Sequence, residues 1–161
     1  MLYERPKTYF LCAGEGAGST RLNAFDEALR AAGIGDINLV RLSSILPPGC
    51  DEVPCFRPPA GSLVPTAYAK MTSETPGETI AAAVAIGIPE ADDEAGLIME
   101  YHGRATAAEA LATVEAMVRE GMARRDRAIR RIESTVLDAR VVDEARAVFA
   151  GVVMWKEVID G

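Results

Sequence analysis

The sequence predicts an α+β fold in a single domain, and two observations carry that prediction. Two segments have the apolar spacing of a helix, whereas six or seven have the branched or alternating pattern of strands. The strands often follow one another directly, and the clearest helix comes late, which favours layered sheets over a doubly wound parallel sheet. A chain of 161 residues is long enough to bury one good core, so we expect one domain over residues 1–161.

The first segments of the chain predict a strand, a glycine loop and a helix. Residues 7–14 are typical of a strand that runs into glycines, and residues 14–20, GEGAGST, indicate a flexible loop. A helix is expected over residues 23–33, with Asn23 as its N-cap and Gly33 as its stop. Phosphate-binding loops occur in the same strand–loop–helix order. The spacing of the glycines therefore decides whether this segment is a phosphate-binding loop or an ordinary connection.

That spacing is not the spacing of a nucleotide-binding motif. Gly14, Gly16 and Gly18 give G-x-G-x-G rather than G-x-G-x-x-G, and no Gly-Lys-Ser/Thr follows them as in a P-loop. A tight or mobile connection, in which glycine permits positive φ angles, explains the same residues. We therefore assign this segment no chemistry beyond the edge of a pocket.

A second strand, residues 38–42, runs into two serines. Proline cannot donate to a β-ladder, so the Pro-Pro-Gly of residues 47–49 ends the extended segment. Ser43 and Ser44 thus stand where a stiff element meets a loop. Hydroxyl groups are common at such turns for purely local reasons, so the pair alone does not assign a function.

The rest of the chain predicts five strands and one long helix. The strands are expected over residues 62–73, 78–88, 95–103, 128–139 and 145–156. The alanines of residues 78–88 are also compatible with a helix. Residues 106–125 have helical spacing, and Thr106 with Glu109 forms a capping-box pattern at the start of this segment.

Composition and charge exclude several classes of function. The net charge of −7, from 17 basic and 24 acidic side chains, argues against a nucleic-acid partner and is compatible with a cationic small substrate. Three cysteines without a C-x-x-C pair argue against a disulfide framework and for a reducing cytoplasm. With His102 they match no zinc-ligand spacing, so no metal is expected. No signal-peptide core and no apolar run of about 18 residues occurs, so neither export nor a membrane span is expected.

Two carboxylates are candidates for chemistry. Glu100 lies in the apolar strand GLIMEYHG; burial would raise the pKa of its carboxyl and suit a general acid, whereas an outward side chain would be ordinary. Asp26 lies one turn into the first helix, where acidic residues are also common for dipole reasons. His102 has no serine or cysteine in a nucleophile motif, so no catalytic triad is indicated.

Five segments together resemble the pyruvoyl-dependent arginine decarboxylases, a family of small self-processing enzymes. The segments are LNAFDEAL (22–29), AGIGDINLVRLSSILPP (32–48), GSLVPTAYAKMTSETPGETIAAAVAIGIP (61–89), GLIMEYHG (96–103) and RRIES (130–134). They occur in the family's order and cover most of the chain, with Asn38, the serine pair and Glu100 at the family's spacing. The resemblance implies a layered αββα sandwich assembled as trimers, with sites between neighbouring subunits, and a cytoplasmic role in polyamine biosynthesis.

The resemblance implies that the chain cuts itself between Ser43 and Ser44. In this family the second serine's hydroxyl attacks the carbonyl of the first, the amide becomes an ester, and elimination with hydrolysis leaves a pyruvoyl group. The expected products are chain 1–43 and chain 44–161, which begins with the covalent pyruvoyl cofactor. By resemblance, Asn38 is a processing residue that donates a hydrogen bond near the scissile carbonyl.

The resemblance also implies how L-arginine is converted to agmatine and CO2. The pyruvoyl ketone forms a Schiff base with the substrate amine, and the adjacent amide carbonyl is the electron sink after CO2 leaves. The glutamate that matches Glu100 protonates the α-carbon, and the aspartate that matches Asp26 meets the guanidinium of the substrate. Leu22, Gly35 and Ile37 occupy positions that line the family's substrate pocket.

Two alternatives remain open. One is a pyruvoyl decarboxylase of another amino acid, such as histidine or aspartate, although Asp26 disfavours an acidic substrate because like charges repel in a dry pocket. The other is an unprocessed, non-catalytic subunit of a homo-oligomer. The presence of Asn38, both serines and Glu100 argues against a silent subunit.

Overall fold

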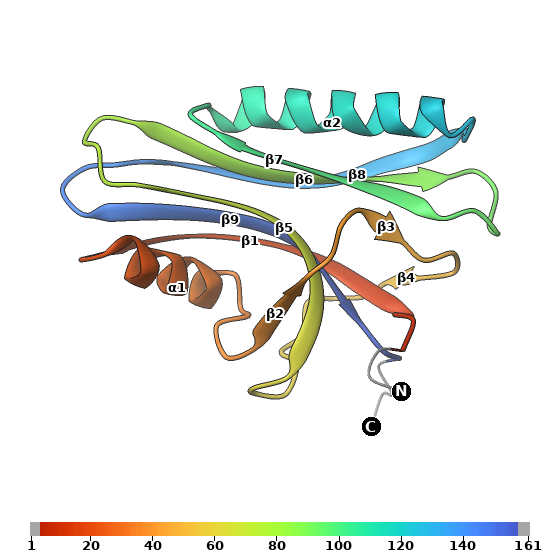
Figure 1. Ribbon diagram of the computed structural model, residues 1–161, viewed down its shortest axis with the longest axis horizontal. Helices are drawn as coiled ribbons and strands as arrows, with labels where there is room; N and C mark the ends of the chain where they lie inside the picture. The colour runs from red at the N-terminus through yellow and green to blue at the C-terminus, as the bar shows by residue number, and fades with distance from the viewer. Residues whose placement is uncertain (1–3, 158–161) are drawn as a thin grey trace.

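A computed structural model describes residues 4–157 of the chain as four stacked layers, a helix, two sheets and a second helix (Figure 1). The elements are β1 (Thr8–Gly18), α1 (Arg21–Ala31), β2 (Asn38–Arg41), β3 (Ile45–Leu46), β4 (Asp51–Glu52), β5 (Leu63–Ser73), β6 (Thr79–Pro89), β7 (Gly96–Gly103), α2 (Ala107–Arg124), β8 (Ile129–Arg140) and β9 (Ala145–Trp155). Residues 1–3 and 158–161 of the expected domain lie outside the described residues. The two helices and two sheets confirm the predicted α+β class, and their stacking is consistent with an αββα sandwich.

The strands of the described chain form two sheets. The first sheet has the order β2-β5-β9-β1-β4, and the second has the order β3-β7-β6-β8. β1 pairs in parallel with β4, and β2 pairs in parallel with β5, whereas the other pairs are antiparallel. The seven longer strands correspond to the predicted ones. β3 and β4 have two residues each, too few to show a period, so sequence reasoning did not find them.

Three clusters of buried side chains pack the two sheets and the two helices against one another. The middle one lies between the sheets, where residues such as Val148 of β9 meet residues such as Val84 of β6. α1 buries Ala24 and Ala28 against the outer face of the first sheet. α2 buries an apolar face that includes Val114 against the outer face of the second sheet. The space between the sheets is therefore the interior of the molecule, and each helix closes one outside face.

β6 is the strand whose alanines left its type open, and it is buried on both faces. Every residue from Ile80 to Ile86 is fully buried. Ala81, Ala83 and Ala85 face α2, and the residues between them face the first sheet. A strand that is covered on both faces needs no polar alternation, which is why the pattern of β6 resembles that of a buried helix.

The expectation of a flexible loop over residues 14–20 is wrong, because residues 14–18 continue β1. They pair with β9 in antiparallel register as far as Gly18, which lies opposite Ala145. The loop between β1 and α1 is reduced to two residues, 19–20. No long glycine loop remains that could wrap a phosphate.

The glycines of β1 instead allow α1 to touch the strand. A Cβ atom on Gly14 would lie 2.2 Å from the carbonyl oxygen of Ala28, and one on Gly16 would lie 2.5 Å from the carbonyl oxygen of Ala24. Real Cβ atoms do not approach other atoms so closely, so only glycine fits. The alternation G-x-G-x-G is the period of a strand face, and it marks the face on which the helix lies.

The helix ends follow the predicted chemistry, with one correction. The N-cap of α1 is Thr20 rather than Asn23: the Thr20 hydroxyl accepts a hydrogen bond from the backbone N–H of Asn23, so Asn23 lies in the first turn. Gly33 has a φ of 83°, which confirms it as the residue that ends the helix. The capping box of Thr106 and Glu109 at the start of α2 is also confirmed.

Candidate active site

The segment between β2 and β3 carries the chain from the first sheet to the second. The pairing of β2 with β5 extends to Leu42, whose backbone N–H donates to the carbonyl of Thr66 at 3.0 Å. The next backbone hydrogen bond that the structure shows belongs to the second sheet, where the N–H of Ile98 donates to the Ser44 carbonyl at 2.7 Å. The peptide bond between Ser43 and Ser44 is therefore the step at which the chain changes sheets.

The serine pair combines a fixed backbone with accessible side chains. Leu42 is bound to one sheet and Ser44 to the other, so the peptide between the two serines is held at both ends. Ser43 is exposed and Ser44 is partly exposed. An attack between neighbouring groups is fastest when their geometry is fixed in advance, and this crossing supplies such a constraint.

Glu100 faces the interior, which decides between the two readings of this residue. It lies on β7 two residues beyond Ile98, and residues two apart on a strand point to the same face. Ile98 packs in the layer between the sheets, so Glu100 points to the edge of that layer, and its side chain is 17% exposed. Burial raises the pKa of the Glu100 carboxyl above its ordinary value.

Arg41, the last residue of β2, is a site residue that sequence reasoning missed. Its Nη2 donates to Glu100 Oε2 at 2.9 Å and to the Tyr68 carbonyl at 3.0 Å. Its guanidinium lies 4.5 Å from the centroid of the Tyr68 ring. The charge of Arg41 and its hydrogen bond lower the pKa of Glu100 and oppose the larger effect of burial. A lone arginine in the apolar strand NLVRL is the one signal in the sequence that points to it.

Asn38 lies at the other end of β2 from the serine pair. Its side-chain amide donates to the carbonyl of Gly61 at 3.0 Å. An extended chain rises ~3.3 Å per residue, so Asn38 lies roughly 16 Å from Ser43 along the strand. The structure therefore does not bring Asn38 to the serine peptide of its own chain.

The four residues expected to bind substrate gather near α1, apart from the serines. Leu22 and Asp26 are four residues apart on α1 and share one exposed stripe of the helix. Gly35 and Ile37 line a cavity of about 430 Å³, together with Arg30, which continues the same stripe. α1 covers the outer face of the first sheet, whereas Glu100 faces the space between the sheets. One chain thus carries two separate groups of candidate residues.

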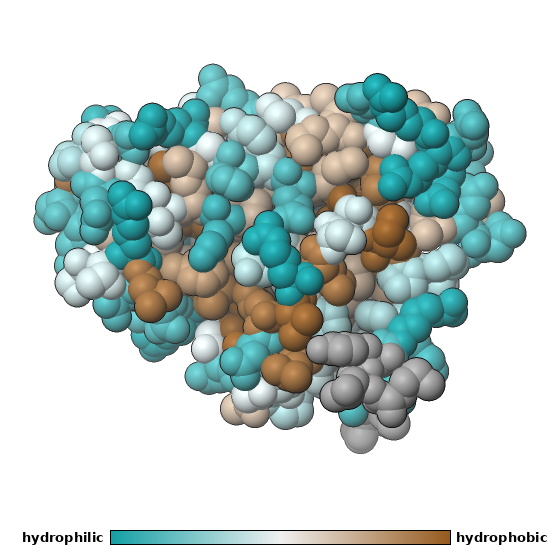
Figure 2. Space-filling model, in the orientation of Figure 1, coloured by the Kyte–Doolittle hydropathy of each residue, from teal (hydrophilic) through white to brown (hydrophobic). Residues whose placement is uncertain are grey.

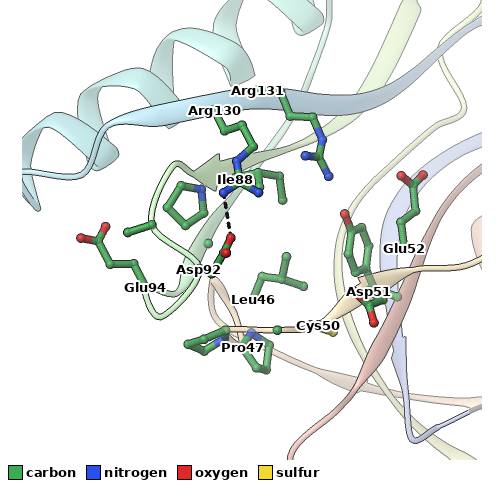
Figure 3. A pocket seen from close by; sticks show the side chains of 16 residues that line it. Leu46, Pro47, Cys50, Asp51, Glu52, Ile88, Asp92, Glu94, Arg130 and Arg131 are labelled. Atoms are coloured by element: carbon green, nitrogen blue, oxygen red, sulfur yellow. Dashed lines mark hydrogen bonds and ion pairs between the residues drawn. The ribbon is translucent and has the colours of Figure 1, made fainter.

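A further cavity of about 290 Å³ borders Leu46 of β3 (Figure 3). Figure 3 shows acidic residues of β4 on one side and of the β6–β7 turn on the other, where Arg130 pairs with Asp92 at 2.7 Å. Burial and the neighbouring Glu133 raise the pKa of Glu52 there. None of the predicted site residues lines this cavity.

The remaining candidates carry no site in the described chain. His102 is exposed on β7. Among residues 4–157, no group of three or more His, Cys, Asp and Glu side chains is placed to hold a metal ion. Cys12, Cys50 and Cys55 are free thiols. Neither α1 nor α2 has the length and apolar character that a membrane crossing requires.

The Ser43–Ser44 segment passes from one sheet to the other next to β7, the strand that carries the largely buried Glu100, and is therefore the candidate active site. The family model for pyruvoyl-dependent arginine decarboxylases matches residues 8–155. The chain therefore belongs to the pyruvoyl-dependent arginine decarboxylase family, and the resemblance carried by the five sequence segments is confirmed.

Individual relatives agree with this assignment, and each is named pyruvoyl-dependent arginine decarboxylase. The protein from Methanocaldococcus jannaschii is 44% identical over 153 residues, which cover 95% of this chain and 92% of the relative. The one from Thermococcus sibiricus is 44% identical over 157 residues, covering 96% and 98%. The one from Pyrococcus abyssi is 42% identical over 158 residues, covering 96% and 99%.

Proposed function

We propose that the chain decarboxylates L-arginine to agmatine and CO2 with a pyruvoyl group made from its own Ser44. The family match and the activity named for the relatives support this reaction. The observation that carries the proposal is the Ser43–Ser44 peptide, which lies where the chain crosses between the sheets and directly precedes the Ser44 carbonyl bound to β7, the strand of Glu100.

The residues at the crossing fit a pyruvoyl group. Ser44 has the three-carbon skeleton from which the group is made, and its carbonyl is held by the N–H of Ile98, a bond that a cut before Ser44 leaves in place. Ser44 is partly exposed, so a small amine can approach it. When present, the group would supply a ketone that binds the substrate amine, and the amide carbonyl next to it would accept the electron pair left by CO2.

Self-processing requires a nucleophile, a fixed peptide and an elimination. The Ser44 hydroxyl attacks the Ser43 carbonyl carbon, and a C–O ester bond replaces the C–N bond of the peptide. Loss of the Ser44 α-proton then breaks its Cβ–O bond, which leaves chain 1–43 with a carboxylate. Water finally replaces the nitrogen of Ser44, which leaves as ammonia. The backbone bonds of Leu42 and Ser44 support the first step, because they hold the peptide in place.

Asn38 is proposed to assist this cut across a subunit boundary. In its own chain its amide is bound to the Gly61 carbonyl, and β2 separates it from Ser43. A hydrogen bond from Asn38 to a scissile carbonyl thus requires an adjoining copy of the chain. Dependence of the cutting rate on protein concentration, in dilute refolded samples, tests this role.

Glu100 is proposed to deliver the proton during turnover. It lies on the strand that holds Ser44 and faces the layer between the sheets. Because burial raises the pKa of its carboxyl, a larger share remains protonated as the pH approaches neutral. Asp26 is proposed to receive the guanidinium of arginine, with Leu22, Gly35 and Ile37 around the aliphatic part of the substrate.

The two separate groups of residues support a homo-oligomer, and we propose a trimer of two-chain protomers. Asp26 and Glu100 lie on opposite sides of the first sheet, so one substrate can meet both only at a junction of two copies. Leu22 and Leu63 are 76% and 61% exposed, which suits surfaces that a second copy covers. Figure 2 shows apolar surface gathered over β2 and the neighbouring part of β5.

We also propose a cytoplasmic location and a role in polyamine biosynthesis.

The choice of substrate tests the proposed reaction. Release of CO2 and of the corresponding amine should be measured with cleaved protein on L-arginine, L-histidine and L-aspartate. A site built to pair a guanidinium should favour arginine in kcat/KM by at least ~100-fold. A higher kcat/KM on another of these amino acids would assign the other substrate, and no release from any of them would contradict the proposed reaction.

A further inference from the structure

The contacts of Arg41 connect the two sides of the proposed cut. Arg41 lies two residues before the end of chain 1–43, whereas its side-chain partners, Tyr68 and Glu100, both lie in chain 44–161. Glu100 belongs to the second sheet and Tyr68 to the first, so the guanidinium also bridges the sheets. None of these contacts involves an atom of Ser43 or Ser44.

We propose that Arg41 is a positioning residue that fixes the orientation and the ionisation of Glu100 during turnover. This inference rests on the proposed role of Glu100. The bond of 2.9 Å between Arg41 Nη2 and Glu100 Oε2 holds the carboxyl at the edge of the inter-sheet layer. The bond to the Tyr68 carbonyl and the stack on the Tyr68 ring hold the guanidinium itself, so the arginine is fixed before it meets Glu100.

The surroundings of Glu100 contain no other strong charge among the described residues. On β6, Val84 lies opposite Glu100, and on β5 the Tyr68 carbonyl binds Arg41 rather than Glu100. His102 follows two residues later on the same face of β7 and is exposed. Within residues 4–157, Arg41 is the one charged group that shifts the pKa of Glu100.

Burial and the charge of Arg41 have opposite effects on the ionisation of Glu100. This combination suits a proton donor that must take up a new proton after each turnover. Burial alone favours a carboxyl that stays protonated and releases its proton reluctantly. The charge of Arg41 stabilises the carboxylate that remains after the proton has been delivered. Removing that charge should therefore raise the pKa of Glu100, so that the carboxyl stays protonated to a higher pH.

The pH dependence of kcat tests this inference. In cleaved wild-type enzyme, kcat should fall as the pH rises through the pKa of Glu100 in the substrate complex. In Arg41→Gln this alkaline limb should move up by about one pH unit, a tenfold change in the acid dissociation constant. Arg41→Lys retains the charge and should keep most of the wild-type position. Arg124→Gln, which removes an exposed arginine paired with Glu120 on α2, is the matched control and should leave the limb in place.

A titration of Glu100 by carboxyl-carbon NMR gives a reading that needs neither the cut nor turnover. In uncut Ser44→Ala protein, the pKa of Glu100 should rise when Arg41→Gln is added and should stay nearly constant with Arg41→Lys. If Arg41→Gln does not fold, Glu100→Asp reports on the same contact, because the shorter side chain cannot keep it. The aspartate should then titrate above Glu100, although its ordinary pKa is lower.

The outcomes separate this inference from the proposed function. An unshifted Glu100 titration in Arg41→Gln, or an equal shift in Arg41→Lys, overturns the role of Arg41. In a Glu100→Asp test, titration below Glu100 does the same. If Glu100→Gln turns over at the wild-type rate, Glu100 is not the proton donor, and the role of Arg41 in turnover fails with it even where the two residues remain coupled in the NMR titration.

Discussion

Two short stretches of unusual composition, the glycines of residues 14–18 and the serines of residues 43–44, differ completely in what they do. The glycines have the more suggestive sequence, yet they continue β1 and serve only to admit the backbone of α1. The serines are two ordinary polar residues, yet they form the peptide at which the chain leaves one sheet for the other. The glycine segment is a packing surface, and the serine segment is the candidate site.

In this chain the candidate site lies where the chain passes from one sheet to the other, whereas the glycine segment lies within a strand. The serine peptide is held by a different sheet at each end, and Glu100 and Arg41 meet beside it from those two sheets. Variants at the candidate site should change processing or turnover and leave helix packing unaffected. A variant in the glycine segment should do the opposite.

The largest expected effect is that of Ser44→Ala, which should abolish the cut. No hydroxyl remains to attack the Ser43 carbonyl, so a single uncut chain should be seen on a denaturing gel. Ser43→Ala is the matched control, because only the hydroxyl of the second serine takes part in the bond changes, and this variant should still cut. Two chains from Ser44→Ala, or an uncut Ser43→Ala that folds normally, would contradict the assigned roles.

Glu100→Gln should separate processing from turnover. The acyl shift uses a hydroxyl that is already in the backbone, so the variant should still give two chains. A positioned general acid contributes about 10²–10⁴-fold to a rate, so agmatine release should slow by at least ~100-fold. Intact mass measures the cut, and a single-turnover assay measures the release. A cleaved variant with wild-type turnover would assign the proton to another group, with Tyr101 or a bound water as the next candidates.

Asp26→Asn should weaken the use of arginine without affecting the cut. A charge-assisted pair is worth about 1.5–3 kcal/mol, which corresponds to a loss of roughly tenfold to a hundredfold in kcat/KM. Asp143→Asn, an exposed carboxylate in the β8–β9 turn, is the control for the change in net charge. Unchanged kcat/KM in Asp26→Asn would place the guanidinium site elsewhere.

Gly16→Ala changes the other side of the comparison and should have the smallest effect on chemistry. Its Cβ would lie 2.5 Å from the Ala24 carbonyl oxygen, so α1 must move away from β1. Overpacking of this kind typically costs about 1–3 kcal/mol, which urea unfolding of the uncut Ser44→Ala protein would measure. Glu15→Ala, on the opposite face of β1, should change the free energy of unfolding by less than about 0.5 kcal/mol. If both variants unfold alike, the glycines do not serve helix packing.

The sequence was sufficient for some features that depend on neighbouring residues, although the N-cap of α1 was placed at Asn23 instead of Thr20. The capping box of Thr106 and Glu109 and the stop at Gly33 are local, and both were predicted correctly. The glycine segment failed because its period of two was read as a loop, although a helix lay on its face. That helix contact, unlike a cap, is not visible in the order of the residues.

The candidate site was predictable only in part, for a similar reason. Ser43, Ser44 and Glu100 could be named from the resemblance, and the interior direction of Glu100 was one of two stated alternatives. Arg41 was not found because it meets Glu100 from a strand 59 residues away and in the other sheet. The separation of Asp26 from Glu100 by the first sheet depends on the layering and also could not be read from the sequence.

The cut at the crossing is the central claim, and the intact mass of the purified wild-type protein tests it. We expect two chains, residues 1–43 and 44–161, with the larger one blocked at its start by a pyruvoyl group. Reduction with borohydride should add two hydrogens to that chain and to no other. A single uncut chain of 161 residues, or a cut at any other bond, would contradict the assignment of this crossing as the site.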